Sequence, residues 1–353
     1  MKISYLKYLS AYSLPIVVML SIYWGGWWSY TAVIYLFVII PFFEIFMDGS
    51  QENMDAVEEE LAKEDRVYDF LLYGLVPFQL VILGYFLYRV GDGSLLLYEK
   101  IGMITAYGMA AGQAINNAHE LGHRRNKFEQ FLSKLLLLTS LYMHFFIEHN
   151  RGHHKHVATD DDPASSRYGE NIYAFYLRTV SGSWMSAWQL EAKRIKKTDA
   201  QFWSWENEML RFQVIQLGLL LLIGLTFGVS VLLSFMVGAI IGFLLLETVN
   251  YIEHYGLRRK KKARGYERTL PVHSWNSNHP LGRLILLELS RHSDHHFMAN
   301  RKYQILRHFD ESPQMPTGYP GMMLMAMIPP IWFRVMHKKI DEYKQSVYGE
   351  NLA

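Results

Sequence analysis

Long apolar runs without a charged side chain constrain the fold of this chain more than any other feature. Residues 214–246, VIQLGLLLLIGLTFGVSVLLSFMVGAIIGFLLL, contain no Asp, Glu, Lys or Arg, whereas residues 258–268, RRKKKARGYER, are dense in charge. About 20 apolar residues are enough for a helix to cross a bilayer. This segregation is typical of an integral membrane protein, and the mean hydropathy of +0.01 over the whole chain hides it.

Six membrane-spanning helices are predicted, joined by short connections into three hairpins. They cover about residues 10–26, 30–47, 69–89, 97–118, 212–230 and 232–252. The start of the chain is similar to a signal peptide, but no small-residue cleavage site follows, so an uncleaved first span is expected. We expect one all-α membrane domain over residues 1–353, with a cytoplasmic cap built from residues 119–211 and 253–353.

The apolar segment 131–147, FLSKLLLLTSLYMHFFI, is predicted to lie in the interface or to dip into the membrane and return. Histidines precede it at 119 and 123 and follow it from 149 onward, and a further crossing would put them on opposite faces. Lysine and arginine concentrate on the histidine side, whereas the three hairpin tips carry almost none. The positive-inside rule therefore predicts a cytoplasmic histidine face, with both termini on that side.

Four groups of histidines fall on this face, in NNAHELGH (116–123), EHNRGHH (148–154), IEHYG (252–256) and RHSDHH (291–296). Spacings of three and four residues place imidazoles on one face of a helix. Buried imidazoles without partners are costly, so such clustering indicates a metal site. The candidate ligands are His119, His123, His149, His153, His154, His254, His292, His295 and His296.

The number of histidines also limits the choice of metal. A tetrahedral zinc site has only four ligands, so nine histidines are too many for one such site. They fit two metal ions, each bound by four or five nitrogens. Imidazole is a suitable ligand for zinc, copper, iron and nickel. Two metal ions bound only by nitrogen in a membrane enzyme point to iron and to reactions with oxygen. Composition alone does not exclude copper.

Other polar residues near these groups are candidates to orient the ligand rings, or are ordinary solvated groups. The candidates are Glu120, Glu148, Glu253, Asp294 and His273, while His279 could line the site. His144, His156, His308 and His337 are expected to be structural or exposed.

Several classes of protein are excluded or disfavoured. The absence of cysteine excludes disulfides and thiolate-bound zinc, iron–sulfur or haem sites. The basic residues lie beside the spans and not along a helix face, so no nucleic-acid partner is expected. A metal transporter would need ionisable residues at mid-membrane, and the predicted spans are nearly free of them.

The motifs together resemble a known family. NNAHELGH, FFIEHNRGHHKHVATDDDPASSRYGE, NYIEHYGL, HSWNSN, LSRHSDHH and PTGYPGM are similar to segments of the membrane-bound alkane monooxygenases, in the membrane fatty-acid desaturase and hydroxylase superfamily. The resemblance implies six transmembrane helices, two non-haem iron ions on the nine histidines, and O2-dependent hydroxylation of linear alkanes to primary alcohols. A fatty-acyl desaturase or an aromatic-methyl (xylene-type) monooxygenase is the alternative.

The resemblance also implies partners and a location. Electrons would come from a rubredoxin reduced by a flavoprotein reductase; since the chain has no cysteine, we expect a separate rubredoxin. The location would be the bacterial inner membrane, with an apolar substrate dissolved in the lipid. The run Arg258, Arg259, Lys260, Lys261, Lys262 and Arg264 is either the docking surface for acidic rubredoxin or a topology signal. Trp24, Trp27 and Trp28 could shape the substrate channel or form an interfacial belt.

Overall fold

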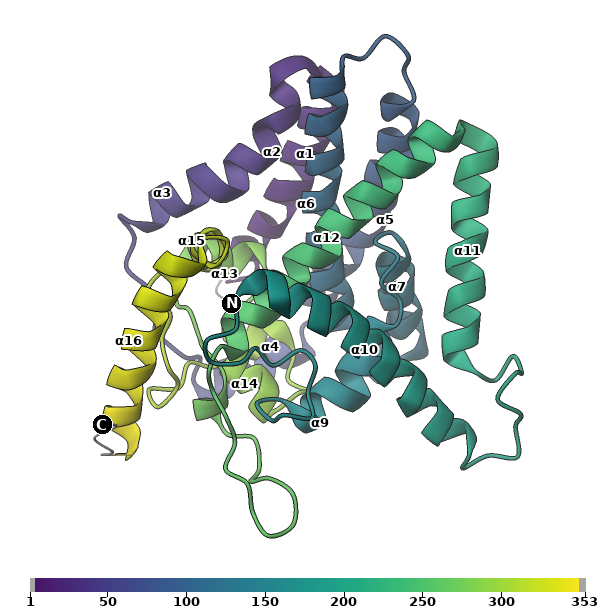
Figure 1. Cartoon of the computed structure of the whole chain (residues 1–353). Coiled ribbons are helices and arrows are strands. Elements are labelled where there is room, and N and C mark those ends of the chain that lie inside the picture. The colour runs from purple at the N-terminus through teal and green to yellow at the C-terminus, as the bar shows by residue number, and fades with distance from the viewer. Residues whose placement is uncertain (1–3, 349–353) are drawn as a thin grey trace.

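The computed structural model describes residues 4–348, which form helices, loops and two isolated bridges. The hairpins of long helices occupy the upper part of the molecule, and the remaining helices and loops lie beneath and beside them (Figure 1). Five helical segments are long and apolar enough to cross a membrane: Ser4–Trp24, Gly26–Glu44, Arg66–Val90, Glu208–Phe227 and Val229–His254. The described part of the chain therefore has the architecture of an all-helical, multi-pass membrane protein.

These five segments correspond to five of the predicted spans, with ends that differ by a few residues. The first joins η1 (Ser4–Tyr12) to α1 (Ser13–Trp24), and the second joins η2 (Gly26–Tyr30), α2 (Thr31–Ile34), η3 (Tyr35–Ile39) and α3 (Ile40–Glu44). The others are α5 (Arg66–Val90), α11 (Glu208–Phe227) and α12 (Val229–His254). The first helix starts earlier than expected because Tyr8 and Ala11 are packed into the core.

The predicted span 97–118 is α6 (Leu97–Gly122), a helix inside the bundle that is not among the five apolar segments (Figure 1). Polar residues line its lower half, and two of them donate hydrogen bonds to the backbone of neighbouring elements. Gln113 Nε2 donates to a carbonyl of η1 at 2.7 Å, and Asn116 Nδ2 donates to the carbonyl of Leu286 at 2.9 Å. Because neighbouring elements cover α6, it can be polar without facing lipid.

The three hairpin turns lie at the same end of the bundle, away from the histidines (Figure 1). They join α1 to η2, α5 to α6, and α11 to α12. In the last of these turns Gly228 has a φ of 86°, in the left-handed region that favours glycine, so α12 starts directly after α11 ends. α6 and α12, which carry histidines at their far ends, therefore both start at these turns and run away from them.

Glycines hold α6 and α12 in close contact. A β-carbon built at Gly108 would lie 2.4 Å from Ile241 Cγ2, and one at Gly242 would lie 2.6 Å from Ala111 Cβ. Gly238 is in similar contact with the ring of Tyr107. Small residues four apart let two membrane helices approach closely, which fixes the spacing of the histidines at their lower ends.

Residues 131–147 do not form one long helix. α7 (Lys127–Leu138) runs back along α6, because Ser133 Oγ donates to Ala118 O at 2.6 Å and Thr139 O accepts from Tyr107 OH at 2.5 Å. The chain then turns at Leu141, whose φ is 55°, and descends toward the histidines. This path enters the bundle and returns to the same end, which is one of the two paths expected from the sequence.

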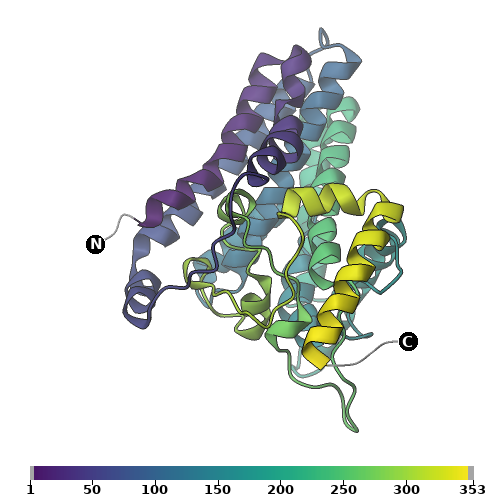
Figure 2. The same cartoon turned by 90° about the vertical axis from the view of Figure 1, so that its left-hand side faces the viewer.

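Helices and loops surround the lower ends of α6 and α12. They include α10 (Ile172–Ile195), α13 (Pro280–Ile285), α14 (His292–Phe297), α15 (Tyr319–Ala326) and α16 (Pro329–Tyr348). α15 and α16, in yellow, stand together on one side of the molecule (Figure 2). Buried Trp332 of α16 packs on the ring of Tyr251 with centroids 5.1 Å apart, and Trp275 Nε1 donates to Tyr255 O at 3.0 Å. Aromatic packing thus fixes the end of α12, where His254 lies.

Candidate metal centre

Nine histidines from four segments converge at the lower ends of α6 and α12, and they are the nine that the sequence singles out. The last turn of α6 carries His119 and is capped by His123, and α12 ends at His254. Three more come from the run of α8 (Phe145–Glu148), η4 (His149–His153) and α9 (His154–His156), and three from α14.

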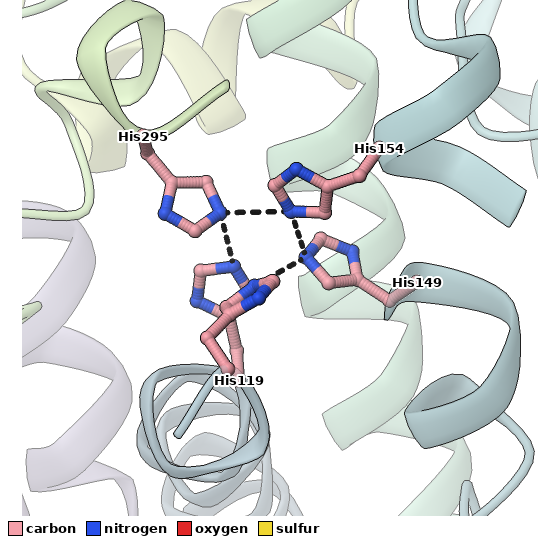
Figure 3. Close-up of side chains that lie close together, drawn as sticks. His119, His149, His154 and His295 are labelled. Atoms are coloured by element: carbon pink, nitrogen blue, oxygen red, sulfur yellow. Dashed lines mark hydrogen bonds between the residues drawn. The ribbon is translucent and has the colours of Figure 1, made fainter. Parts of the chain in front are cut away.

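The nine rings form two groups, within each of which the candidate ligand atoms lie within 4.8 Å of one another. The five-histidine group contains His119, His123, His149, His154 and His295, and the four-histidine group contains His153, His254, His292 and His296. In Figure 3 the labelled members of the five-histidine group turn their nitrogens toward one another. A chain without metal would have no reason to gather so many imidazoles.

The spacing of the nitrogens fits metal coordination. Neighbouring Nε2 atoms are 2.9–3.1 Å apart in the five-histidine group. They are 2.8–3.2 Å apart in the four-histidine group. An ion with metal–nitrogen bonds of about 2.1 Å at right angles would separate adjacent nitrogens by about 3.0 Å. Each group can therefore hold one metal ion through the Nε2 atoms.

A π-helical turn explains how one short run serves both groups. In an α-helix His149 and His153, four apart, would share a face, but η4 spans these residues as a π-helix. The wider turn, with its i→i+5 hydrogen bonds, instead aligns His149 with His154, and these two share the five-histidine group. His153 is thereby turned into the four-histidine group.

α14 divides its histidines in the same way. His292 and His296, four residues apart, belong to the four-histidine group, and His295 belongs to the five-histidine group. Two short segments therefore connect the two groups directly.

Burial keeps most of these rings neutral. Burial, followed by the charges of His153 and Arg124, lowers the pKa of His123 to about 3. Burial and then neighbouring imidazoles also lower the pKa values of His149 and His154. A neutral imidazole offers a lone pair to a metal, so the site is ready to coordinate near pH 7.

His153 differs from its neighbours because it contacts a buried carboxylate. Its Nδ1 lies 2.9 Å from Asp162 Oδ2, which also accepts from Ser165 Oγ at 2.5 Å. Burial alone would lower the pKa of His153, but Asp162 outweighs this effect and raises it. Asp162 holds the Nδ1 proton and leaves Nε2 to face the other histidines. Asp162 was not among the residues predicted from the sequence; its only signal there is the run TDDDP directly after the second histidine group.

Of the five residues proposed to orient ligand rings, Glu253 contacts a candidate ligand through its side chain, while His273 approaches His254 through its backbone. Glu253 Oε2 lies 3.1 Å from His292 Nε2, and its Oε1 accepts from Tyr319 OH at 2.7 Å. The carboxylate is thus on the Nε2 side of the ring, beside the four-histidine group, and not on the outer Nδ1 side.

The side chains of the other four have partners elsewhere. Glu120 pairs with Arg124, and Asp294 accepts from Arg301 and from the backbone of Arg307. Glu148 accepts from Ser186 Oγ at 3.3 Å, and His273 Nε2 lies 3.1 Å from Glu267 Oε1. Residues next to a ligand in a helix point in other directions, which accounts for these partners.

The remaining histidines lie outside both groups. His144 packs against the ring of Tyr142, and His279 Nδ1 contacts Ser277 Oγ. His308 contacts Asn278 and Asp310, His337 contacts Tyr255, and His156 is half-exposed. Trp24, Trp27 and Trp28 are exposed where α1 ends and η2 begins, at one of the hairpin turns, which favours an interfacial belt.

Fold and site together define a class: a membrane-bound protein with a histidine-rich metal centre at one end of its helices. The family model described as fatty acid desaturase matches residues 100–326. The chain is 41% identical over 321 residues to an alkane 1-monooxygenase of Acinetobacter baylyi, covering 90% of this chain and 79% of that protein. It is 42% identical over 319 residues to an alkane 1-monooxygenase of Pseudomonas putida, with the same coverage.

A more distant relative is the hydroxylase component of xylene/toluene monooxygenase from Pseudomonas putida. The two are 26% identical in an alignment of 348 positions that covers 95% of this chain and 89% of that protein. The chain belongs to the fatty acid desaturase family and, within it, to the alkane 1-monooxygenases. The family resemblance expected from the histidine motifs is thereby confirmed.

Proposed function

We propose that the protein hydroxylates the terminal methyl group of linear alkanes, with O2 as co-substrate, to give primary alcohols. The observation that carries this proposal is the pair of histidine groups at the end of a membrane bundle, in a chain about 40% identical to alkane 1-monooxygenases. Two iron ions, one in each group, are the proposed cofactors. Bound iron would supply the activation of O2, which amino-acid side chains cannot provide.

The protein's own contribution is to position the ligands and exclude water. Asp162 fixes His153, and the ring of Phe145 stacks on His149 with centroids 4.6 Å apart. A small cavity of about 10 Å³ beside His119 and His295 is lined by four leucines, Leu286, Leu287, Leu289 and Leu306, and by the polar residues Asn116 and Glu120. An alkane offers no group to protonate or to hydrogen-bond, so the leucines are the part of this lining that suits a terminal methyl group.

The proposed topology has six crossings, with α6 as the fourth, in one membrane domain over residues 1–353. The lower region forms a cap on the cytoplasmic side of the bacterial inner membrane, where both termini also lie. Two facts support this orientation: the hairpin turns share one end of the bundle, and the basic residues concentrate at the other.

A separate rubredoxin, supplied with electrons by its reductase, is the proposed donor. Within the basic run 258–264, the residues whose side chains already bind the protein's own backbone are less available to rubredoxin than the exposed ones. Arg258 donates to carbonyls of Ser166 and Leu257, and Arg259 donates to the carbonyl of Glu267. These two arginines therefore hold the loop in place. Lys261, Lys262 and Arg264 are exposed at its tip and are the proposed docking cations.

The test is a reconstituted assay with purified membranes, rubredoxin, rubredoxin reductase and NADH. Octane should give 1-octanol, and the iron content should approach two ions per chain. Xylene serves as the competing substrate, because of the more distant xylene/toluene relative. Methyl oxidation of xylene with no 1-octanol would overturn the alkane assignment, and desaturation of an added acyl lipid would indicate the desaturase alternative.

A further inference from the structure

The helix α10 carries an exposed apolar stripe, although it is not among the five segments that are apolar enough to cross a membrane. Tyr173, Leu177 and Trp184 lie on one face of this helix, because spacings of four and seven residues correspond to one and two turns. These residues are 54%, 79% and 43% exposed. A row of large apolar side chains on a surface indicates a contact with something other than water.

The exposed side of α10 also lacks a free charge over most of its length. Between Ile172 and Ala192 the sequence has two charged residues. One of them, Arg178, donates to both carboxylate oxygens of Glu170 at 2.7 Å, and the other, Glu191, is buried. Exposed lysines follow only after this stretch, at Lys193, Lys196 and Lys197. A surface helix in water normally has charged residues along its outer face, so the outer face of α10 is unusual.

The inner side of α10 is occupied by the segment that carries three of the candidate ligands. Ser186 Oγ donates to Glu148 at 3.3 Å, and Glu191 Oε2 accepts from Arg151 of η4 at 3.1 Å. The inner side therefore holds the histidine segment in place. The apolar stripe faces outward and takes no part in this packing.

Both ends of α10 are tied to the ends of membrane spans. Just before its start, the carbonyl of Glu170 accepts from Tyr251 OH of α12 at 2.7 Å. Near its end, Glu191 Oε1 accepts from the backbone N–H of Glu208, the first residue of α11, at 2.7 Å. α11 and α12 meet at Gly228, at the opposite end of the bundle (Figure 1). α10 therefore runs between these two spans at the level where both leave the membrane.

A row of aromatic rings continues from the stripe toward α11. The ring of Trp188 lies 5.9 Å from that of Trp184 and 5.9 Å from that of Phe202, between centroids. Phe202 in turn packs on Trp203 at 5.0 Å, and Trp203 is 75% exposed shortly before α11 begins. Tryptophan is enriched where a membrane meets water, because its ring is apolar and its N–H is polar.

We propose that α10 lies in the surface of the lipid bilayer, on the side of the histidines, as an interfacial helix. The stripe enters the boundary between headgroups and acyl chains, and the lysines that follow it reach the headgroup phosphates. The lipid-facing surface of α11 borders this site: Leu217 and Leu221 are each 63% exposed on a membrane span. The proposal rests on the membrane bundle and is independent of the reaction proposed above.

Fluorescent labels on single cysteines test this proposal, since the chain has no cysteine of its own. Leu177→Cys and Trp184→Cys are labelled with the fluorophore NBD, in the full-length, iron-loaded protein in vesicles of equal amounts of phosphatidylcholine and phosphatidylglycerol. Gln189→Cys is the matched control, because it is exposed on the same helix but turned by about 140° from Trp184. A phosphatidylcholine with a nitroxide near the headgroup end of one acyl chain should quench both stripe labels several-fold more than the control.

Equal quenching at the three positions would overturn the proposal. Purified rubredoxin tests a protein as the competing occupant. Weak quenching of the stripe labels by the lipid, with a change in their fluorescence when rubredoxin is added, would also overturn the proposal. Leu177 is the more exposed of the two stripe positions, so its label decides the result if Trp184→Cys does not fold. None of these measurements uses alkane oxidation, so a negative result is distinct from failure of the proposed function.

Discussion

Asp162→Asn should weaken metal binding at the four-histidine group without unfolding the protein. The carboxylate lies 2.9 Å from His153 Nδ1 and holds the ring with Nε2 toward its neighbours. An asparagine keeps the shape but replaces a charge-assisted hydrogen bond with a neutral one and can present its amide instead of an oxygen. Loss of such a partner typically costs 10- to 100-fold in metal affinity, or about 1.4 to 2.7 kcal/mol.

The measurement is the iron content of the purified variant under increasing concentrations of a chelator. Asp161→Asn is the matched control, because Asp161 is the neighbouring residue and is largely exposed. Its Oδ2 lies 4.0 Å from Nδ1 of His156, a histidine outside both groups. The concentration of chelator that removes half of the iron should fall 10- to 100-fold in Asp162→Asn alone. Equal iron retention by the two variants would refute the reasoning that Asp162 orients a ligand.

Three further predictions concern other parts of the molecule. Gly242→Leu should force α12 away from α6 and lower both the melting temperature and the iron content, because a β-carbon at position 242 would lie 2.6 Å from Ala111 Cβ on α6. Gly218→Leu is the control and should change neither, because Gly218 has open space around it. His254→Ala should remove at least half of the iron and abolish alcohol formation, whereas His156→Ala should retain both. Lys261→Glu should raise the rubredoxin concentration needed for half-maximal rate several-fold at low salt, and an effect that persists unchanged at high salt would contradict electrostatic docking.

The sequence predicted the existence of the membrane helices better than their ends or their environment. Apolar composition identified five segments correctly because lipid-facing residues must be apolar along most of their length. α6 is a different case: its length was expected, but Gln113 and Asn116 on it donate hydrogen bonds to distant parts of the chain. The turn at Leu141 depends on the backbone conformation of one residue, which composition does not encode.

At the site, the sequence indicated which histidines gather but not how they divide. The division depends on the π-helical turn at His149–His153, and the motif EHNRGHH contains no signal that separates a π-turn from an α-turn. Proximity in sequence was also a poor guide to the residues that orient the histidine rings. Asp162 reaches His153 through a loop, while Glu148, next to a candidate ligand, accepts from Ser186.

The division of η4 and α14 between the two groups has a consequence for assembly. Each of these short segments contributes histidines to both groups, so ordering it around one ion also places rings for the other. The second ion then binds a more ordered site and costs less conformational entropy. Metal uptake should therefore be positively cooperative, and chains that hold a single ion should be scarce at every stage of loading.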